Sequence, residues 1–194
     1  MSNGTYRNSG LGFTCKIPAG WVLRTEEMNA PEEDEPAPSG DKEAPPSKDS
    51  RAALDRTAEG GCPHACGRVL LAAFSRPPEA RAEDVNSSIL IAAESAASYP
   101  GLKDAAQYFG PVTEVATAQG FESLGEPYEF EVGAKTVARA DYQKNVGTRV
   151  MRQSTLVVLA RGYAVSFTFI GGTEDEVEEL AQGLSFTANR SAGR

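Results

Sequence analysis

The sequence predicts an α+β protein in which a mainly antiparallel sheet of about six to seven strands is covered by two helical regions. Three observations support this prediction. Residues 149–186 read as a strand hairpin followed by an amphipathic helix. Other apolar segments alternate with period two, which is typical of half-buried strands. Short turns join the strands from residue 121 onward, and short connections favour antiparallel neighbours.

The C-terminal hairpin is the clearest element. Residues 149–160 are rich in β-branched and long apolar side chains, and Arg161-Gly162 then supplies a two-residue turn. Over 163–170 the large side chains fall on one face of the strand: Tyr163, Val165, Phe167 and Phe169. This aromatic face requires a cover.

The segment after the hairpin can provide that cover. Thr173 stands three residues before Glu176, the spacing of a helix capping box. Apolar residues then recur with helical spacing: Val177, Leu180, Ala181 and Leu184. The pattern predicts a helix that folds back onto its own sheet.

The remaining elements follow from weaker patterns. Strands are expected over residues 11–18, 68–75, 86–95, 121–125, 128–132 and 135–143, with a turn at 144–147. A helical stripe runs over 102–119 but is interrupted at Gly110-Pro111. Because proline removes a backbone donor, we expect a kink or two short helices there.

Residues 24–61 form a long acidic, proline-rich insertion with few apolar side chains. Such a composition buries too little surface to offset the entropy of ordering the chain. We therefore expect a largely irregular insertion within a single domain that spans residues 1–194. A loop of this length is either functional or disordered, so a mobile loop and a partner-binding loop both stay open.

Composition excludes some classes of protein. The net charge of -8 argues against a general nucleic-acid binder, since phosphate contacts need clustered Lys and Arg. No apolar run approaches the roughly 20 residues of a membrane span. Residues 1–4 lack the basic start and apolar stretch of a signal peptide.

Two groups of residues are candidates for chemistry. Cys62, His64 and Cys66 could bind a metal, but a structural zinc site needs a fourth ligand. The alternatives are a Cys62–Cys66 disulfide and free thiols, whereas Cys15 reads as a buried small hydrophobe. We expect no cofactor.

The second group is charged: Arg139, Asp141, Arg149 and Arg152. They read as ion pairs on a solvated sheet face, with a ligand-binding cluster as the alternative. The chain has one His, and it lies in the insertion, where a catalytic triad would not be held rigidly. Nucleophile-elbow, phosphate-loop and dinucleotide motifs are absent from the sequence.

Several core segments resemble the PsbP-like family, which includes photosystem II extrinsic subunits, a Ran-binding protein and bacterial secreted proteins or lipoproteins. The matching residues are Leu11-Gly12-Phe13, Ile17-Pro18, Gly20-Trp21, Gly162-Tyr163-Ala164-Val165, the helix from Glu174 to Leu184, and Leu184-Ser185-Phe186. The resemblance implies an α/β/α sandwich around an antiparallel sheet. It does not carry over one function, because members of one fold do different things.

We expect a non-catalytic binding or assembly module that acts outside the cytoplasm and has a protein partner. The alternative is a small-ligand carrier or enzyme that uses the cleft between the sheet and the helices. A polar pocket that holds Arg139, Arg152 or Glu94 would favour this alternative.

Overall fold

The computed structural model describes residues 4–30, 67–80, 84–133 and 135–187. Its larger sheet contains β3 (Val22–Leu23), β4 (Gly67–Phe74), β5 (Ser88–Ser95), β6 (Glu122–Ser123), β7 (Tyr128–Val132), β8 (Lys135–Val146), β9 (Arg149–Ala160) and β10 (Tyr163–Gly171). The smaller sheet contains β1 (Thr5–Asn8), β2 (Phe13–Lys16) and β11 (Leu184–Phe186). The helices are α1 (Thr25–Met28), α2 (Phe109–Ala118) and α3 (Glu174–Gln182), with 3-10 turns at Ala96–Ser98 and Ala106–Tyr108.

All strand pairs in the described residues are antiparallel, as the sequence predicts. The large sheet has the order β3-β4-β5-β10-β9-β8-β6, and β7 also pairs with β8. The small sheet has the order β1-β2-β11. The expected count of six to seven strands was too low, because β1, β3 and β11 are short and carry little period-two signal.

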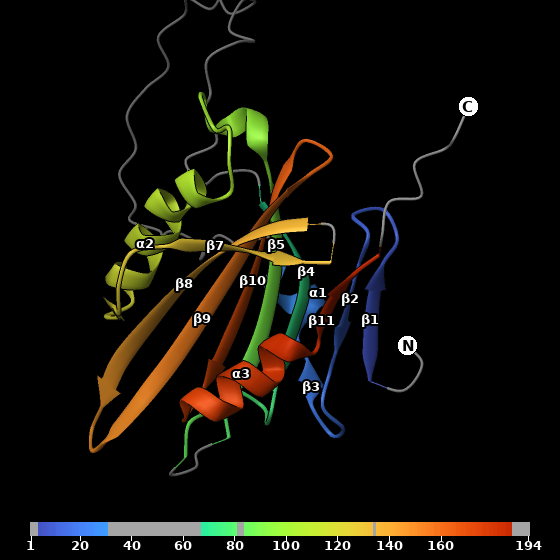
Figure 1. The fold of residues 1–194 in the computed structure, drawn as a ribbon. Coiled ribbons are helices and arrows are strands. Elements are labelled where there is room, and N and C mark those ends of the chain that lie inside the picture. Colours follow the sequence, from blue (N-terminus) through green and yellow to red (C-terminus); the bar gives the residue numbers. More distant parts are fainter. Residues whose placement is uncertain (1–3, 31–66, 81–83, 134, 188–194) are drawn as a thin grey trace, which may run out of the picture.

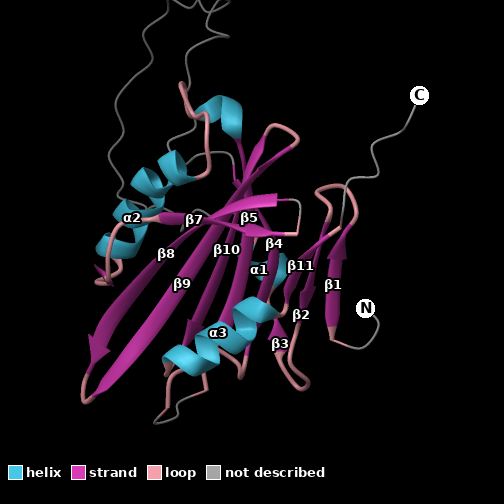
Figure 2. Ribbon diagram, viewed as in Figure 1, coloured by secondary structure: helices cyan, strands magenta, loops and turns pink. Residues whose placement is uncertain are grey.

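The elements form layers around the large sheet (Figure 1, Figure 2). One face carries Phe167 and Phe169, which are fully buried in a core shared with α3 and the small sheet. The other face carries Ala138 and Ala140, which belong to a second core beneath α2. This arrangement is the expected α/β/α sandwich, in which the helix after the hairpin covers the aromatic face.

The β9–β10 hairpin forms where the sequence predicts it. Arg161 and Gly162 both have positive φ values, 52° and 82°. A two-residue turn with positive φ at both positions matches the right-handed twist of the flanking strands. The turn therefore fixes the register in which Tyr163 pairs with Ala160.

An aromatic contact ties the two sheets together. Phe167 of β10 meets Phe13 of β2 edge-on at a centroid distance of 4.9 Å, and it meets Phe186 of β11 at 5.8 Å. Cys15 is completely buried beside this contact, and the loss of solvent raises its thiol pKa to about 12. The prediction that Cys15 is a buried hydrophobe rather than a reactive thiol is confirmed.

The interruption at Gly110-Pro111 takes the second of the two expected forms, because two short helical segments form there: the 3-10 turn at Ala106–Tyr108 and α2. Pro111 lies in the first turn of α2, where a missing N–H costs nothing. Two other local details differ from the prediction. Residues 144–146 continue β8 instead of forming a turn. The start of the predicted irregular insertion forms α1.

Side chains fasten α1 to the outer edge of β4. The Asn29 amide donates to the Val69 carbonyl and accepts from the Val69 N–H, at 2.8 and 3.0 Å. The Thr25 hydroxyl accepts from the Ala72 N–H at 3.0 Å. These groups replace a neighbouring strand at an edge that would otherwise expose unpaired peptides.

Candidate binding site

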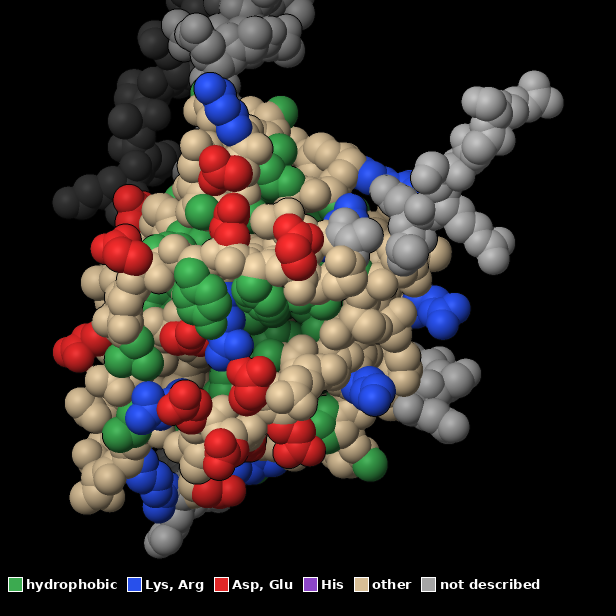
Figure 3. All heavy atoms as spheres, viewed as in Figure 1, with side chains coloured by type: hydrophobic (Ala, Val, Ile, Leu, Met, Phe, Trp, Pro, Cys, Tyr) green, Lys and Arg blue, Asp and Glu red, His purple; other side chains and the backbone are tan. Residues whose placement is uncertain are grey.

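A hollow of about 330 Å³ opens on the α3 face of the large sheet. Its floor is formed by β8 and β9, one wall by the start of α3, and the opposite wall by the β6–β7 loop and the start of β7. Figure 3 shows this hollow, with hydrophobic side chains in its interior and acidic side chains around it. Arg139, Asp141 and Arg152 of the predicted charged group all line it.

Arg139 lies on the floor of the hollow and holds two carboxylates. Its Nε donates to Asp141 Oδ1 at 3.0 Å, and its Nη1 donates to Glu178 Oε2 of α3 at 2.8 Å. The Arg139 side chain is only 15% exposed. The alternation of β8 explains why Arg139 and Asp141 share a face, since they are two residues apart.

The pKa shifts in this cluster agree with its geometry. Burial opposes the charge on Arg139, but hydrogen bonds to Glu178 and Asp141 outweigh it and raise the pKa of the guanidinium. The hydrogen bond from Arg139 lowers the pKa of Glu178. The positive charge of Arg139 is therefore neutralised within the protein.

Three other charged side chains line the hollow: Arg152 from β9, Glu126 from the β6–β7 loop and Glu174 from the first turn of α3. None of the three forms an ion pair within the described part of the chain. Arg152 is half-buried, whereas the two glutamates are exposed. The hollow is thus lined by one cation and two anions that have no ion pair among the described residues.

An apolar rim completes the hollow. Leu124 and Tyr128 are each 48% exposed, which is unusual for large apolar side chains, and both line it. The Tyr128 ring contacts the Phe130 ring at 6.1 Å, and Phe130 in turn packs on the core. Partial burial raises the pKa of the Tyr128 hydroxyl, so this group stays protonated.

The structure does not bring Arg149 to the same hollow. Arg149 lines a separate depression near the start of α3, together with Ser87 and Thr173. Its spacing of three residues from Arg152 is odd, and an odd spacing in a strand does not keep two side chains on one face. Of the four charged residues that were expected to form one group, Arg139, Asp141 and Arg152 line the hollow, whereas Arg149 lies elsewhere.

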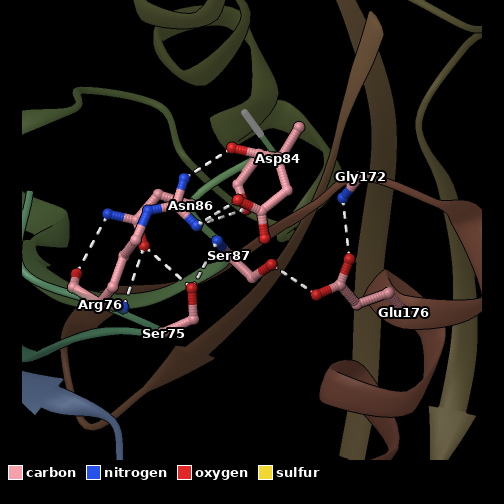
Figure 4. Close-up of polar contacts among 8 residues, drawn as sticks. Ser75, Arg76, Asp84, Asn86, Ser87, Gly172 and Glu176 are labelled. Carbon is pink, nitrogen blue, oxygen red and sulfur yellow. Dashed lines mark hydrogen bonds and ion pairs between the residues drawn. The ribbon is translucent and has the colours of Figure 1, made fainter. Parts of the chain in front are cut away.

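A hydrogen-bonded network lies beside that depression (Figure 4). We call it the clamp network; it joins the β4–β5 connection to α3 through Ser75, Arg76, Asn86, Ser87, Gly172 and Glu176. The Glu176 carboxylate accepts from the Gly172 N–H at 2.9 Å and from the Ser87 hydroxyl. The Asn86 side chain accepts from the Ser75 hydroxyl at 2.9 Å and donates to the Arg76 carbonyl at 3.1 Å.

Glu94 lies away from the hollow, on the α2 face of the sheet. The Tyr99 hydroxyl donates to its carboxylate. Burial and this hydrogen bond raise the pKa of Tyr99 to about 12. A tyrosine shifted in this direction is a poor general base, which indicates a packing role for the pair.

Cys62, His64 and Cys66 lie outside the described residues, as does most of the 24–61 insertion. Within the described residues, no group of three His, Cys, Asp or Glu side chains has an arrangement that could hold a metal ion. In the same part of the chain, every helix is too short or too polar to cross a bilayer.

Sequence reasoning missed five residues that the site uses: Leu124, Glu126, Tyr128, Glu174 and Glu178. A signal existed for Glu178, because it flanks the apolar stripe of α3 and a flanking residue lies at the edge of the helix–sheet contact. Leu124 and Tyr128 read only as parts of short strands. The fold of the β6–β7 loop over the sheet gives them their position.

Comparison with known proteins finds no matching family model and no matching curated protein. It does find solved structures. Cyanobacterial PsbP (CyanoP) from Synechocystis sp. PCC 6803 is 15% identical in sequence, with a TM-score of 0.50. The match covers 94% of this chain and 91% of that one. The chain has the PsbP-like fold.

Two other solved structures match this chain with lower TM-scores. The Saccharomyces cerevisiae Ran-binding protein Mog1p is 15% identical, with a TM-score of 0.44 over 94% of this chain and 84% of that chain. LpqN from Mycobacterium tuberculosis, described as involved in cell envelope biogenesis, is 15% identical, with a TM-score of 0.33 over 62% and 78%. At these identities the PsbP-like likeness describes the fold only.

Proposed function

We propose that this protein is a non-catalytic binding module and that its contact surface is the hollow between α3 and β7. The observation that carries the proposal is the combination of exposed Leu124 and Tyr128 with the half-buried arginines of the floor. Tyrosine and arginine around a concave surface are the residue types that dominate binding energy at protein interfaces. The proposed partner is a protein.

The ion pairs of the floor support this role. Arg139 is held by Asp141 and Glu178, so the floor keeps its shape when the hollow is empty. A rigid surface loses little side-chain entropy on binding, and this increases affinity. The Tyr128 hydroxyl at the rim is not an activated nucleophile, since burial raises its pKa.

A site-specific cross-linking experiment tests the proposal. A photoreactive amino acid is introduced at Leu124 in one variant and at Val115 in another. Both positions are exposed, at 48% and 59%, but Val115 lies on α2, on the opposite face of the sheet. We expect Leu124 to cross-link a discrete partner in native extract and Val115 to yield none.

The control for specificity is Tyr128→Ala in the Leu124 variant. This substitution removes a rim side chain and should abolish the cross-link while leaving the thermal unfolding midpoint nearly unchanged, because Tyr128 is half-exposed. Equal products from Leu124 and Val115, or none from Leu124, would contradict the proposal.

A second candidate function is a small-ligand carrier. The volume of about 330 Å³ lies within the range of small-molecule pockets, roughly 300–1,000 Å³. Arg139 and Arg152 both line the hollow, and a polar pocket that holds these arginines favours a small-ligand carrier.

A location outside the cytoplasm is part of the proposal. It rests on the resemblance to secreted members of the PsbP-like family and on the spacing of Cys62 and Cys66, which would suit a disulfide in an oxidising compartment. Alkylation followed by mass spectrometry of the protein from its native source measures this directly. Two alkylated thiols at these positions would count against it.

A further inference from the structure

The three unpaired charges around the hollow identify the kind of ligand that fits it. We propose that the hollow binds a compound whose ammonium and carboxylate groups lie close together, as in an α-amino acid or a short peptide with an apolar side chain. This inference rests on the second candidate function above and specifies its substrate class.

The carboxylate would bind Arg152. The two arginines of the hollow differ in one respect: Arg139 holds two carboxylates of the protein, whereas Arg152 has no ion-pair partner among the described residues. Partial burial of a charge without a partner is unfavourable, and a ligand carboxylate would relieve it. Guanidinium groups bind carboxylates with two parallel hydrogen bonds.

The register of the sheet places no charged side chain directly across from Arg152, so Arg152 is available to bind a ligand. Its direct neighbours across the strands are Gln143 of β8 and Gly171 of β10, and neither carries a charge. Gly171 itself carries no side chain, and the Glu176 carboxylate and Val177 of α3 lie over it. A carboxylate could therefore approach Arg152 without displacing an acidic side chain of the sheet.

The ammonium group would bind between the two walls. Glu174 projects from the start of α3 and Glu126 from the β6–β7 loop, and both line the hollow. A ligand with only a carboxylate would be repelled by these two glutamates, and a ligand with only an ammonium group would be repelled by Arg152. A compound that carries both charges satisfies all three side chains.

The apolar part of the ligand would contact Leu124, Tyr128 and Val177. Leu124 and Tyr128 are exposed at the rim, whereas Val177 is buried at the base of α3. Covering Leu124 and Tyr128 removes apolar surface from water, which favours binding. The volume of about 330 Å³ accommodates an amino acid or a dipeptide.

The test begins with a binding screen by protein-observed NMR. The twenty amino acids and the dipeptide Leu-Leu are added separately at millimolar concentration to the full chain. For one or more apolar probes, we expect saturable shifts that are confined to the β6–β7 loop, β7, β8, β9 and α3. Calorimetry then measures the dissociation constant of the best probe.

Changes to the probe and to the protein should report the same contacts. With L-leucine as the example, L-leucinamide lacks the carboxylate and N-acetyl-L-leucine lacks the ammonium group. The amide and the Arg152→Gln variant should each bind about 10- to 100-fold more weakly, as expected when a charge-assisted hydrogen bond is lost. The acetylated probe and Glu174→Gln should show a loss of similar size.

Two matched variants control for general charge effects. Arg149→Gln removes an arginine of the same strand outside the hollow, and Glu179→Gln removes an exposed acid of the same helix. Both should bind the probe as the unmodified protein does. Circular dichroism melts of all four variants establish that each one folds.

Two results would overturn the inference. One is the absence of saturable binding by every amino acid and by Leu-Leu. The other is binding that Arg152→Gln and Glu174→Gln leave unchanged. Either result leaves the protein-binding proposal standing if the Leu124 cross-link forms, so the two failures are distinguishable.

Discussion

Two polar regions contact α3: the clamp network and the hollow. They differ in whether their polar side chains are bonded to other groups of the protein. In the clamp network, Glu176 accepts from Gly172 and Ser87, and Asn86 is bonded to Ser75 and Arg76. Among the described atoms of this network, only Arg76 Nε is buried without a partner. In the hollow, Arg152, Glu126 and Glu174 have no ion pair within the described residues.

This difference separates stability from recognition. Polar groups that bond with each other fix the chain and lose free energy when a partner is removed. Charges that remain available contribute little to folding but can bind a ligand. Substitutions in the clamp network should therefore change stability, whereas substitutions of the unpaired charges in the hollow should change binding.

The largest expected loss of stability follows Glu176→Ala. This change removes the acceptor of the Gly172 N–H and of the Ser87 hydroxyl, and Ser87 is only 4% exposed. We expect a loss of about 2–3 kcal/mol in the free energy of unfolding, measured by urea titration. Glu179→Ala on the exposed side of α3 is the control and should change stability by less than about 0.5 kcal/mol.

A smaller effect is expected from adding one methyl group beside the same carboxylate. A Cβ at Gly171 would lie 2.9 Å from Glu176 Oε2 and 3.1 Å from Val177 Cγ2. Gly171→Ala should therefore push the carboxylate off its donors and cost about 1–2 kcal/mol. At Gly172 the nearest atom would be 3.6 Å away, so Gly172→Ala should unfold at the same urea concentration or slightly higher. Equal losses at both glycines would show that Glu176 does not set the packing.

The floor of the hollow should give a smaller, pH-dependent effect. The hydrogen bond from Arg139 lowers the pKa of Glu178, so the carboxylate stabilises the fold above its unfolded pKa, and this contribution disappears as the pH falls through the folded pKa. Since Glu178 is 44% exposed, Glu178→Gln should cost less than about 1 kcal/mol at pH 7. Urea titrations at pH 7 and pH 3 should show that the difference from the unmodified protein shrinks at the lower pH.

Local sequence patterns predicted the elements but not their contacts. Strand alternation placed Phe167 and Phe169 on one face, and the Thr173–Glu176 capping box placed the start of α3; the Thr173 side chain does accept from the Glu176 N–H. These signals lie within a few residues of each other. Glu176 also bonds to Ser87, 89 residues earlier, and this contact depends on how α3 lies against the β4–β5 connection.

The hollow shows the same limit. Arg139 and Asp141 could be paired from the sequence because they share a strand face. The partnership with Glu178 could not, because it spans 39 residues and depends on the placement of α3. The rim was the hardest part of the hollow to predict from the sequence, because Leu124 and Tyr128 gain their role from the path of the β6–β7 loop over the sheet.

The smallest expected effect on stability is a gain and not a loss, and it concerns Ser154. Ser154 of β9 is fully buried, and its hydroxyl has no hydrogen-bond partner in the described part of the chain. It lies directly across from Asp141 of the floor. Burial of an unpaired hydroxyl is unfavourable, so Ser154→Ala should leave stability unchanged or raise it by up to about 1 kcal/mol. A urea titration that shows a clear loss of stability would contradict this prediction and would indicate that the hydroxyl has a partner, such as a buried water.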